Sequence, residues 1–408
     1  MDAQAAGAAL TGQDEQAQEP SFEELLETFD LFNTAHADVV HDFMKYARAK
    51  CPVPHTKARG GQYLITRYDD VRRALTDYDS FSSHGDANVV GTNGVVLPPI
   101  DEDPPQHHQF RQLLNPYFHP RRLAAEEPRI RDIARKTISP WLEAGHCDLI
   151  ADFASPFVTD VLAQVIFDQQ DTEIFRRADE FVTRTATGEA QAFFYFRDVI
   201  AEFVDRRRDA GVNGDDIISK INSAVVNGRK LTDAERTGAV MILFGGGLDT
   251  TKVAIGNIVA ELARDKRLEG VLRQPGWERH VVDEFLRHDS PVVTQGRIAA
   301  QDIEIGGQCI RAGDRIAVHI ASANRDETIF EHADELDFAR ERNPHLAFGL
   351  GVHRCIGMHL ARLQIKVAIE ELLRVITDIR IAPNAVLRRH AGVARVYEEL
   401  PIEFERVQ

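Results

Sequence analysis

Cysteine, methionine and tryptophan are scarce in this chain of 408 residues, which contains four, four and two of them respectively. The four cysteines are Cys51, Cys147, Cys309 and Cys355. They lie far apart and form no Cys-x-x-Cys pair, so the sequence predicts neither a disulfide framework nor a zinc site. Unpaired, infrequent cysteine is typical of a reducing compartment, and we expect a cytoplasmic protein.

Long apolar runs and an excess of positive charge are also lacking. No stretch reaches the ~18 uninterrupted apolar residues that a membrane-spanning helix needs, so we expect no membrane association. Residues 1–20 have neither a basic start nor an apolar core, and we interpret them as a disordered tail before a single domain at 21–408. The formal net charge of −16 disfavours binding to nucleic acid and to anionic membranes.

The sequence pattern predicts a mainly α fold with a minor β region. Gly61–Tyr68 has the composition of a strand, Asp69 is placed to cap a short helix, and residues 82–99 have the Gly- and Asn-rich pattern of a long loop. From Pro104 to about Arg267 the pattern is helical. Further expected elements are a helix at 278–288, strands at 303–305 and 315–320 with a turn at Gly306–Gly307, and a last helix at 356–376.

The segment 231–265 predicts a long helix that is apolar on most faces and therefore buried. Three consecutive glycines, Gly245–Gly247, interrupt it, and each costs ~1 kcal/mol relative to alanine. Such a cost indicates that another body approaches the helix backbone closely.

The segment HLAFGLGVHRCIGMHLAR at 345–362 carries the strongest chemical pattern. In it, Cys355 lies where a glycine-rich loop leads into an amphipathic helix. A helix N-terminus lowers the pKa of a thiol, and loop N–H groups can point at the sulfur, as a thiolate ligand of haem iron requires. Gly357 leaves room for a flat ligand. For the other three cysteines, ordinary core packing is the favoured interpretation.

These residues match every position of the cysteine-ligand signature of the cytochrome P450 family, which the chain resembles from about Gly61 to its C-terminus. It looks closest to soluble bacterial members such as the camphor hydroxylase. The resemblance implies a triangular prism of helices around haem b, with Cys355 as the iron ligand. It also implies that Phe348, Gly349, Gly357 and Gly246 contact the haem.

A second motif, Gly246–Thr251, places an acid beside an alcohol in the central helix. Alone, it fits equally well a core helix in which a threonine bonds back to the preceding turn. The resemblance favours a catalytic role, in which Asp249 and Thr250 deliver protons to dioxygen while bulk water is excluded.

Two charged groups complete the haem environment that the resemblance implies. Glu284 and Arg287, three residues apart on one helix face, would be joined by Arg340 in a buried structural cluster that braces the cysteine loop. Taken alone, such a pair is usually solvated. The expected partners of the haem carboxylates are His107, Arg111, Arg297 and His353. For any one of them, a surface charge is at least as good an interpretation.

The expected substrate is a small hydrophobic molecule, a terpenoid or an alkyl-aromatic compound, because the residues that the resemblance places around it are small or apolar. These are the loop 88–97, Ile242, Gly246, Val293, Thr294, Val393 and Ala394. Core packing is an equally good interpretation of each.

No reductase module is recognisable in the sequence, so we expect electrons from a ferredoxin and an NAD(P)H-dependent ferredoxin reductase. An acidic ferredoxin would be steered by a basic patch, for which the candidates are Arg72, Arg73, Arg354 and Arg362. The alternatives are a peroxygenase, a non-enzymatic haem protein, and a phenol-coupling or ring-forming enzyme of secondary metabolism. The acid–alcohol pair argues against the first two.

Overall fold

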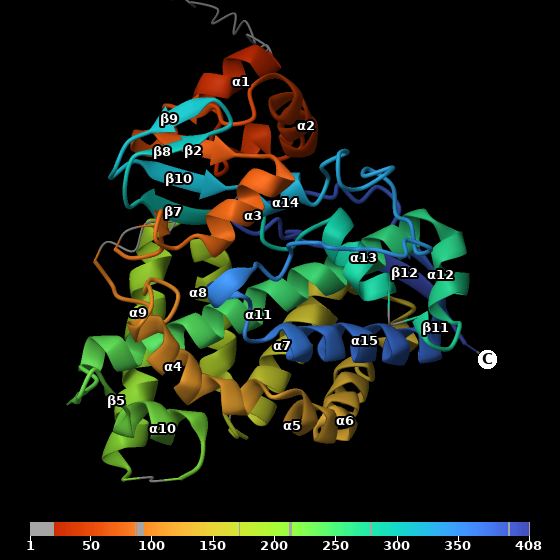
Figure 1. The fold of residues 1–408 in the computed structure, drawn as a ribbon. Helices are drawn as coiled ribbons and strands as arrows, with labels where there is room; N and C mark the ends of the chain where they lie inside the picture. The colour runs from red at the N-terminus through yellow and green to blue at the C-terminus, as the bar shows by residue number, and fades with distance from the viewer. Residues whose placement is uncertain are drawn as a thin grey trace, which may run out of the picture.

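The computed structural model describes residues 20–85, 87, 94–170, 172–211, 214–277, 280–390 and 392–407 (Figure 1). Helices dominate, as the sequence pattern predicted. They are α1 (Phe22–Thr28), α2 (Val40–Lys50), α3 (Tyr68–Thr76), α4 (Gln106–Leu114), α5 (Pro120–Ala125), α6 (Glu127–Ile138), α7 (Ser155–Val161), α8 (Glu173–Ala186), α9 (Ala190–Asp209), α10 (Ile217–Ser223), α11 (Asp233–Arg264), α12 (Lys266–Leu272), α13 (Val281–His288), α14 (Ile320–Ala323) and α15 (Met358–Val375).

The strands form small sheets at the margins of this helical body. They are β1 (His55–Thr56), β2 (Gln62–Ile65), β3 (Phe81–Ser82), β4 (His146–Asp148), β5 (Val225–Val226), β6 (Arg229–Lys230), β7 (Gln295–Ala299), β8 (Ile303–Ile305), β9 (Gln308–Ile310), β10 (Arg315–Val318), β11 (Ile376–Ile381) and β12 (Pro401–Arg406). The largest sheet has the order β1-β2-β10-β7-β3, with β2 and β10 parallel and its other pairs antiparallel. It places Arg297 of β7 opposite Ile316 of β10.

The 32-residue helix α11 crosses the middle of the molecule (Figure 1). A capping box between Thr232 and Glu235 fixes its start, because each residue's side chain bonds the other's backbone N–H. It packs against α7, α8, α9 and α15. At Gly238 an added Cβ would lie 1.9 Å from the Val96 carbonyl oxygen, so only glycine permits this close approach.

Two helical stretches in the described part of the chain are long and apolar enough to cross a membrane, Leu149–Ile166 and Asp233–Arg264. Of their apolar windows, 67% and 72% of the residues are buried inside the protein. Both therefore behave as core helices. The largest apolar cluster surrounds α11 and α15, and a second lies beneath the five-stranded sheet.

Several element boundaries differ from the sequence-based expectation. Strand β2 ends at Ile65, and Tyr68 already belongs to α3, so Asp69 is not the cap of this helix. The N–H of Tyr68 is instead satisfied by the distant Asp326 carboxylate at 2.8 Å. The last helix begins at Met358, and Ile320 opens α14 rather than extending β10. Residues 1–19 of the expected tail, and residues 86 and 88–93 of the expected loop at 82–99, lie outside the described residues.

Candidate active site

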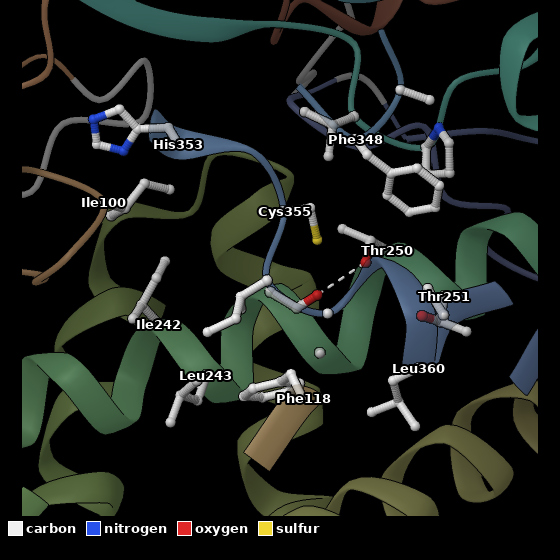
Figure 2. Close-up of a pocket in the computed structure, with 18 of the residues that line it drawn as sticks. Ile100, Phe118, Ile242, Leu243, Thr250, Thr251, Phe348, His353, Cys355 and Leu360 are labelled. Atoms are coloured by element: carbon white, nitrogen blue, oxygen red, sulfur yellow. Dashed lines mark hydrogen bonds between the residues drawn. The ribbon is translucent and has the colours of Figure 1, made fainter. Parts of the chain in front are cut away.

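A cavity of about 250 Å³ lies between α11 and the loop that precedes α15. Gly246, Gly247 and Thr250 line it from α11, and Cys355 and Gly357 line it from the loop. Figure 2 shows the Cys355 thiol and Thr250 in this cavity, which is otherwise walled mainly by apolar side chains such as Leu243, Phe118 and Leu360. The structure thus brings together two motifs that are a hundred residues apart in the sequence.

Glycine geometry shapes the loop that carries Cys355. Gly349 and Gly351 have φ values of 65° and 70°, in the left-handed region that favours glycine. A Cβ on Gly351 would lie 2.6 Å from the Leu75 carbonyl oxygen of α3, so this turn is wedged against that helix. The Cys355 N–H donates to the Phe348 carbonyl oxygen at 2.8 Å, which closes the loop on itself.

Cys355 is an exposed residue whose thiol lines the cavity, while the protein atoms around the sulfur partly desolvate it. Burial raises the pKa of this thiol, while a backbone hydrogen bond from Gly357 and the positive charge of Arg111 oppose that rise. The surroundings of the sulfur therefore include both the apolar wall and the donors that a thiolate ligand uses. Among the described residues, no group of three or more His, Cys, Asp or Glu side chains could hold a metal ion.

A buried cluster braces this loop from behind. Arg287 is fully buried, and its guanidinium donates twice to the Glu284 carboxylate, at 2.9 and 2.8 Å. Arg340 donates to the same carboxylate at 3.3 Å. Arg287 also donates to the Asn324 carbonyl oxygen at 3.0 Å, and the Asn324 side chain accepts from the Leu346 N–H at 2.6 Å. The cluster thus reaches the first residues of the cysteine loop.

Four basic side chains lie close together at the side of the cavity formed by α4, β7 and the cysteine loop. His107 and His353 face each other with ring centroids 4.4 Å apart, and Arg111 donates to the Arg354 carbonyl oxygen at 2.8 Å. Within the described ranges, both ring nitrogens of His107, Nε2 of His353, Nε of Arg111 and one terminal nitrogen of Arg297 are buried without a hydrogen-bond partner.

Burial dominates the ionisation of this basic group. It lowers the pKa of His107 to about 4, of His353 to about 3 and of Arg297 to about 10. Unpaired buried donors are costly, and a nearby anion would both satisfy them and restore their ordinary pKa values. The donor set therefore fits a bound molecule with carboxylate groups at this end. The thiol beside it is suited to coordinate an iron atom. Together they fit haem.

The wall that α11 contributes contains the acid–alcohol pair. The Thr250 hydroxyl donates to the Gly246 carbonyl oxygen at 2.9 Å, which is the back-bonding expected of a core threonine (Figure 2). Its oxygen can still accept a hydrogen bond. Asp249 is 3% exposed, and its Oδ2 has no partner in the part of the chain that the structure describes.

A second cavity of about 270 Å³ continues from the first beneath α8 and α9. Five of the six predicted substrate contacts line it, namely Ile242, Gly246, Thr294, Val393 and Ala394. Val293 is not among the lining residues. Its backbone forms hydrogen bonds with Val393 and Ala321, and its side chain is buried in an apolar cluster with residues of α1 and α2. The neighbouring Val292 lines the cavity instead.

Sequence reasoning missed the residues of α8 and α9 that close the second cavity, such as Val182, Phe193 and Phe196. Nothing in their local pattern separates them from other core positions. It also missed Lys252, whose signal was visible: a lysine in the most apolar part of α11, three residues after Asp249.

Comparisons with known proteins agree with this geometry. A family model described as cytochrome P450 matches residues 279–376. The probable cytochrome P450 127A1 of Sinorhizobium fredii is 35% identical over 83% of this chain and 82% of its own length. The polyketide biosynthesis cytochrome P450 PksS of Bacillus subtilis is 31% identical over 84% and 89%. Among solved structures, cytochrome P450 CYP109Q5 of Chondromyces apiculatus has a TM-score of 0.81 with 28% identity, covering 94% of this chain and 99% of that one.

The buried cluster yields a stability prediction. Replacing Arg287 by alanine leaves the Glu284 carboxylate buried with one fewer cation, so we expect a loss of about 3–5 kcal/mol in the free energy of unfolding. Chemical denaturation measures it. The matched control is Arg311→Ala, which breaks an exposed pair with Asp302 and should leave that free energy nearly unchanged. Equal losses in the two variants would contradict a bracing role for Arg287.

Proposed function

Because this chain belongs to the cytochrome P450 family, and is therefore a haem-dependent monooxygenase, we propose that it hydroxylates a small hydrophobic substrate with dioxygen and two electrons from a ferredoxin system. The observation that carries the proposal is the placement of Cys355 and Thr250 in one apolar cavity, with a second cavity beside it. The net reaction consumes substrate, dioxygen, two electrons and two protons, and it gives the alcohol and water.

The residues at the first cavity would hold haem b between the cysteine loop and α11. Cys355 would ligate the iron through Sγ, and Gly246 and Gly357 leave space on the two sides. The unpaired donors of His107, Arg111, Arg297 and His353 would pair with the haem carboxylates. Bound haem supplies a redox-active iron that reacts with dioxygen.

Asp249 and Thr250 would move the protons. The Thr250 oxygen lies at the cavity wall, and its hydroxyl can exchange its bond to Gly246 for one to a guest molecule by rotation about a single bond. The carboxylate of Asp249, the residue before Thr250, is buried away from bulk water, and it can accept and donate protons. The apolar side chains that line the cavity keep water from the reacting atoms.

The substrate would occupy the second cavity. Its volume of about 270 Å³ lies just below the ~300–1,000 Å³ that is usual for ligand pockets, so a compact guest fits best. Leu97, Phe193 and Phe196 make much of its wall apolar, which favours a terpenoid or an alkyl-aromatic compound. A larger polyketide-type substrate, as the name of the Bacillus subtilis relative suggests for that protein, is the second candidate.

A separate ferredoxin with its NAD(P)H-dependent reductase would supply the electrons, docking where Cys355 lies nearest the surface. The side chain of Arg354 is exposed there, and α3, which carries the exposed Arg72, packs against the turn at Gly351–His353. Arg73 and Arg362 are poorer candidates than the sequence suggested, because Arg73 donates to the Glu304 carbonyl oxygen and Arg362 is paired with Asp283 at 2.7 Å. We further infer a cytoplasmic protein with one haem domain at 21–408.

Replacing Cys355 by alanine tests the proposed function. We expect the wild-type protein to bind haem and, once reduced, to show with carbon monoxide the absorption band from which the family takes its name. The Cys355→Ala variant should lack that band because it lacks the thiolate. Cys309→Ala, which alters an exposed thiol on β9, is the control and should keep the band. Persistence of the band in Cys355→Ala, with native circular dichroism in both variants, would refute the assignment.

A ligand screen tests the substrate class. We expect compact terpenoids and alkyl-aromatic compounds to displace water from the site and shift the Soret band of the ferric protein. Ala394→Phe narrows the second cavity without lining the first, so it should weaken binding of the best ligand by at least about tenfold, or 1.4 kcal/mol. Val386→Phe, at an exposed position, should leave the affinity unchanged. A shift produced only by large polyketides would favour the second candidate.

Charge reversal tests the docking face. Arg354→Glu should slow reduction by an acidic ferredoxin by about tenfold at low ionic strength, because steering of the partner is lost. The difference should shrink as salt screens the charges. Arg267→Glu on α12 changes the net charge equally and should have little effect. Stopped-flow reduction rates measure both, and equal, salt-independent rates in wild type and Arg354→Glu would refute this docking site.

A further inference from the structure

A lysine is buried among the carboxylates next to the proposed proton-delivery pair. Lys252 of α11 is 2% exposed, in the middle of a helix whose other buried residues are mostly apolar. Its Nζ lies 3.1 Å from Oδ1 of Asp249, one turn earlier on the same helix. It also lies 2.9 Å from Oδ1 of Asp179 and donates to the Thr183 hydroxyl at 2.8 Å, both on α8.

The charges around Lys252 favour its protonated, charged form. Burial alone lowers the pKa of Lys252, but the negative charges of Asp249 and Asp179 outweigh burial and raise this pKa above its ordinary value. Two buried carboxylates therefore share one ammonium group. Without that cation they could not both remain ionised so close together in a medium of low polarity.

The two carboxylates are held differently. The second oxygen of Asp179 accepts from the Ser155 hydroxyl, so that side chain is held at both oxygens. Asp249 is held only through Oδ1, by Lys252 and by Thr183 at 3.4 Å, and its Oδ2 is buried without a partner among the described residues. The arrangement fixes the position of Asp249 and leaves one of its oxygens available for exchange.

The cluster also joins two walls of the substrate cavity. Asp179 and Thr183 come from α8, and the same helix places Val182 and Thr185 in the lining of the second cavity. Asp249 and Thr250 line that cavity from α11. The lysine is thus the cation through which the helix above the substrate is connected to the acid.

We propose that Lys252, anchored on α8 by Asp179, is a positioning residue for proton delivery: it keeps the Asp249 carboxylate ionised and aims it at the cavity. This rests on the proposed role of Asp249. The competing interpretation is a purely structural one, in which the lysine neutralises two buried acids and contributes only to stability.

Infrared spectroscopy of the haem-loaded protein tests the charge state without turnover. Lys252→Met has a similar length and no charge, so one carboxyl group should take up a proton. We expect a carbonyl stretching band of a protonated, buried carboxyl group that shifts in D₂O. The band should be absent from wild type and from Lys252→Arg, which restores the cation. Its absence from Lys252→Met would overturn the claim that Lys252 keeps Asp249 and Asp179 ionised.

Turnover tests the positioning role, with ethylbenzene as probe and ferredoxin, reductase and NADH as the electron source. In Lys252→Met the fraction of NADH electrons that are used to form hydroxylated product should fall about tenfold, because proton transfer is misdirected. The remaining electrons should appear in reduced oxygen species. The solvent deuterium isotope effect on product formation should rise. Lys252→Arg should retain at least about a third of the wild-type yield, since it keeps a charge in a different shape.

Lys266→Met is the matched control, because it removes a lysine that is paired with Asp378 at 2.6 Å outside both cavities. Its product yield should stay within about twofold of wild type. If Lys252→Met is only less stable to heat, with wild-type yield and isotope effect, the structural interpretation holds and the proposal is overturned. If the wild-type protein itself never couples NADH to oxidation of any screened compound, the proposed function fails, and the infrared comparison still decides what Lys252 does.

Discussion

The site depends on the rigid placement of one thiol at the entrance to α15. A loop that is closed by the hydrogen bond from the Cys355 N–H to Phe348, and turned by two left-handed glycines, sets the direction of the sulfur. A flexible cysteine would lose conformational entropy on binding a ligand and would tolerate several orientations. Here the loop restricts that orientation, because it is anchored to Asn324 and through it to Arg287.

The buried charges fall into two kinds, and the difference separates structure from function. Around Arg287, donors meet acceptors within the protein: the Glu284 carboxylate and the carbonyl oxygens of Asn324, Ala333 and Glu335. Around His107 and Arg297, some nitrogen atoms have no partner among the residues that the structure describes, although burial makes that costly. A folded protein retains unpaired buried donors where an external group completes them. The same distinction applies within one cluster to Asp179, which is held at both oxygens, and Asp249, which is held at one.

The sequence was informative where the signal is local. The span of α11 follows from its capping box and its apolar faces, and the cysteine loop follows from closely spaced glycines, because these patterns act over a few residues. Asp69 was misjudged as a cap because the N–H that needed a partner is satisfied by Asp326, which is distant in the sequence. Val293 was expected at the cavity, but Val292 lines it and Val293 packs into the core, because neighbouring residues in extended backbone face opposite sides. The role of Lys252 depends on α8, which no local pattern in α11 reveals.

The contact between Gly351 and α3 restricts how this enzyme can be redesigned. The Leu75 carbonyl oxygen occupies the space that any side chain at position 351 would need, so the backbone of the cysteine loop and the backbone of an outer helix are in direct contact. A surface graft that shifts α3 by a fraction of an ångström, for instance to accept a foreign electron donor, would be transmitted to the turn at Gly351–His353, directly before Arg354. A redesign that replaces surface residues on this side of the protein should therefore change α3 and the cysteine loop together, because their backbones are in contact.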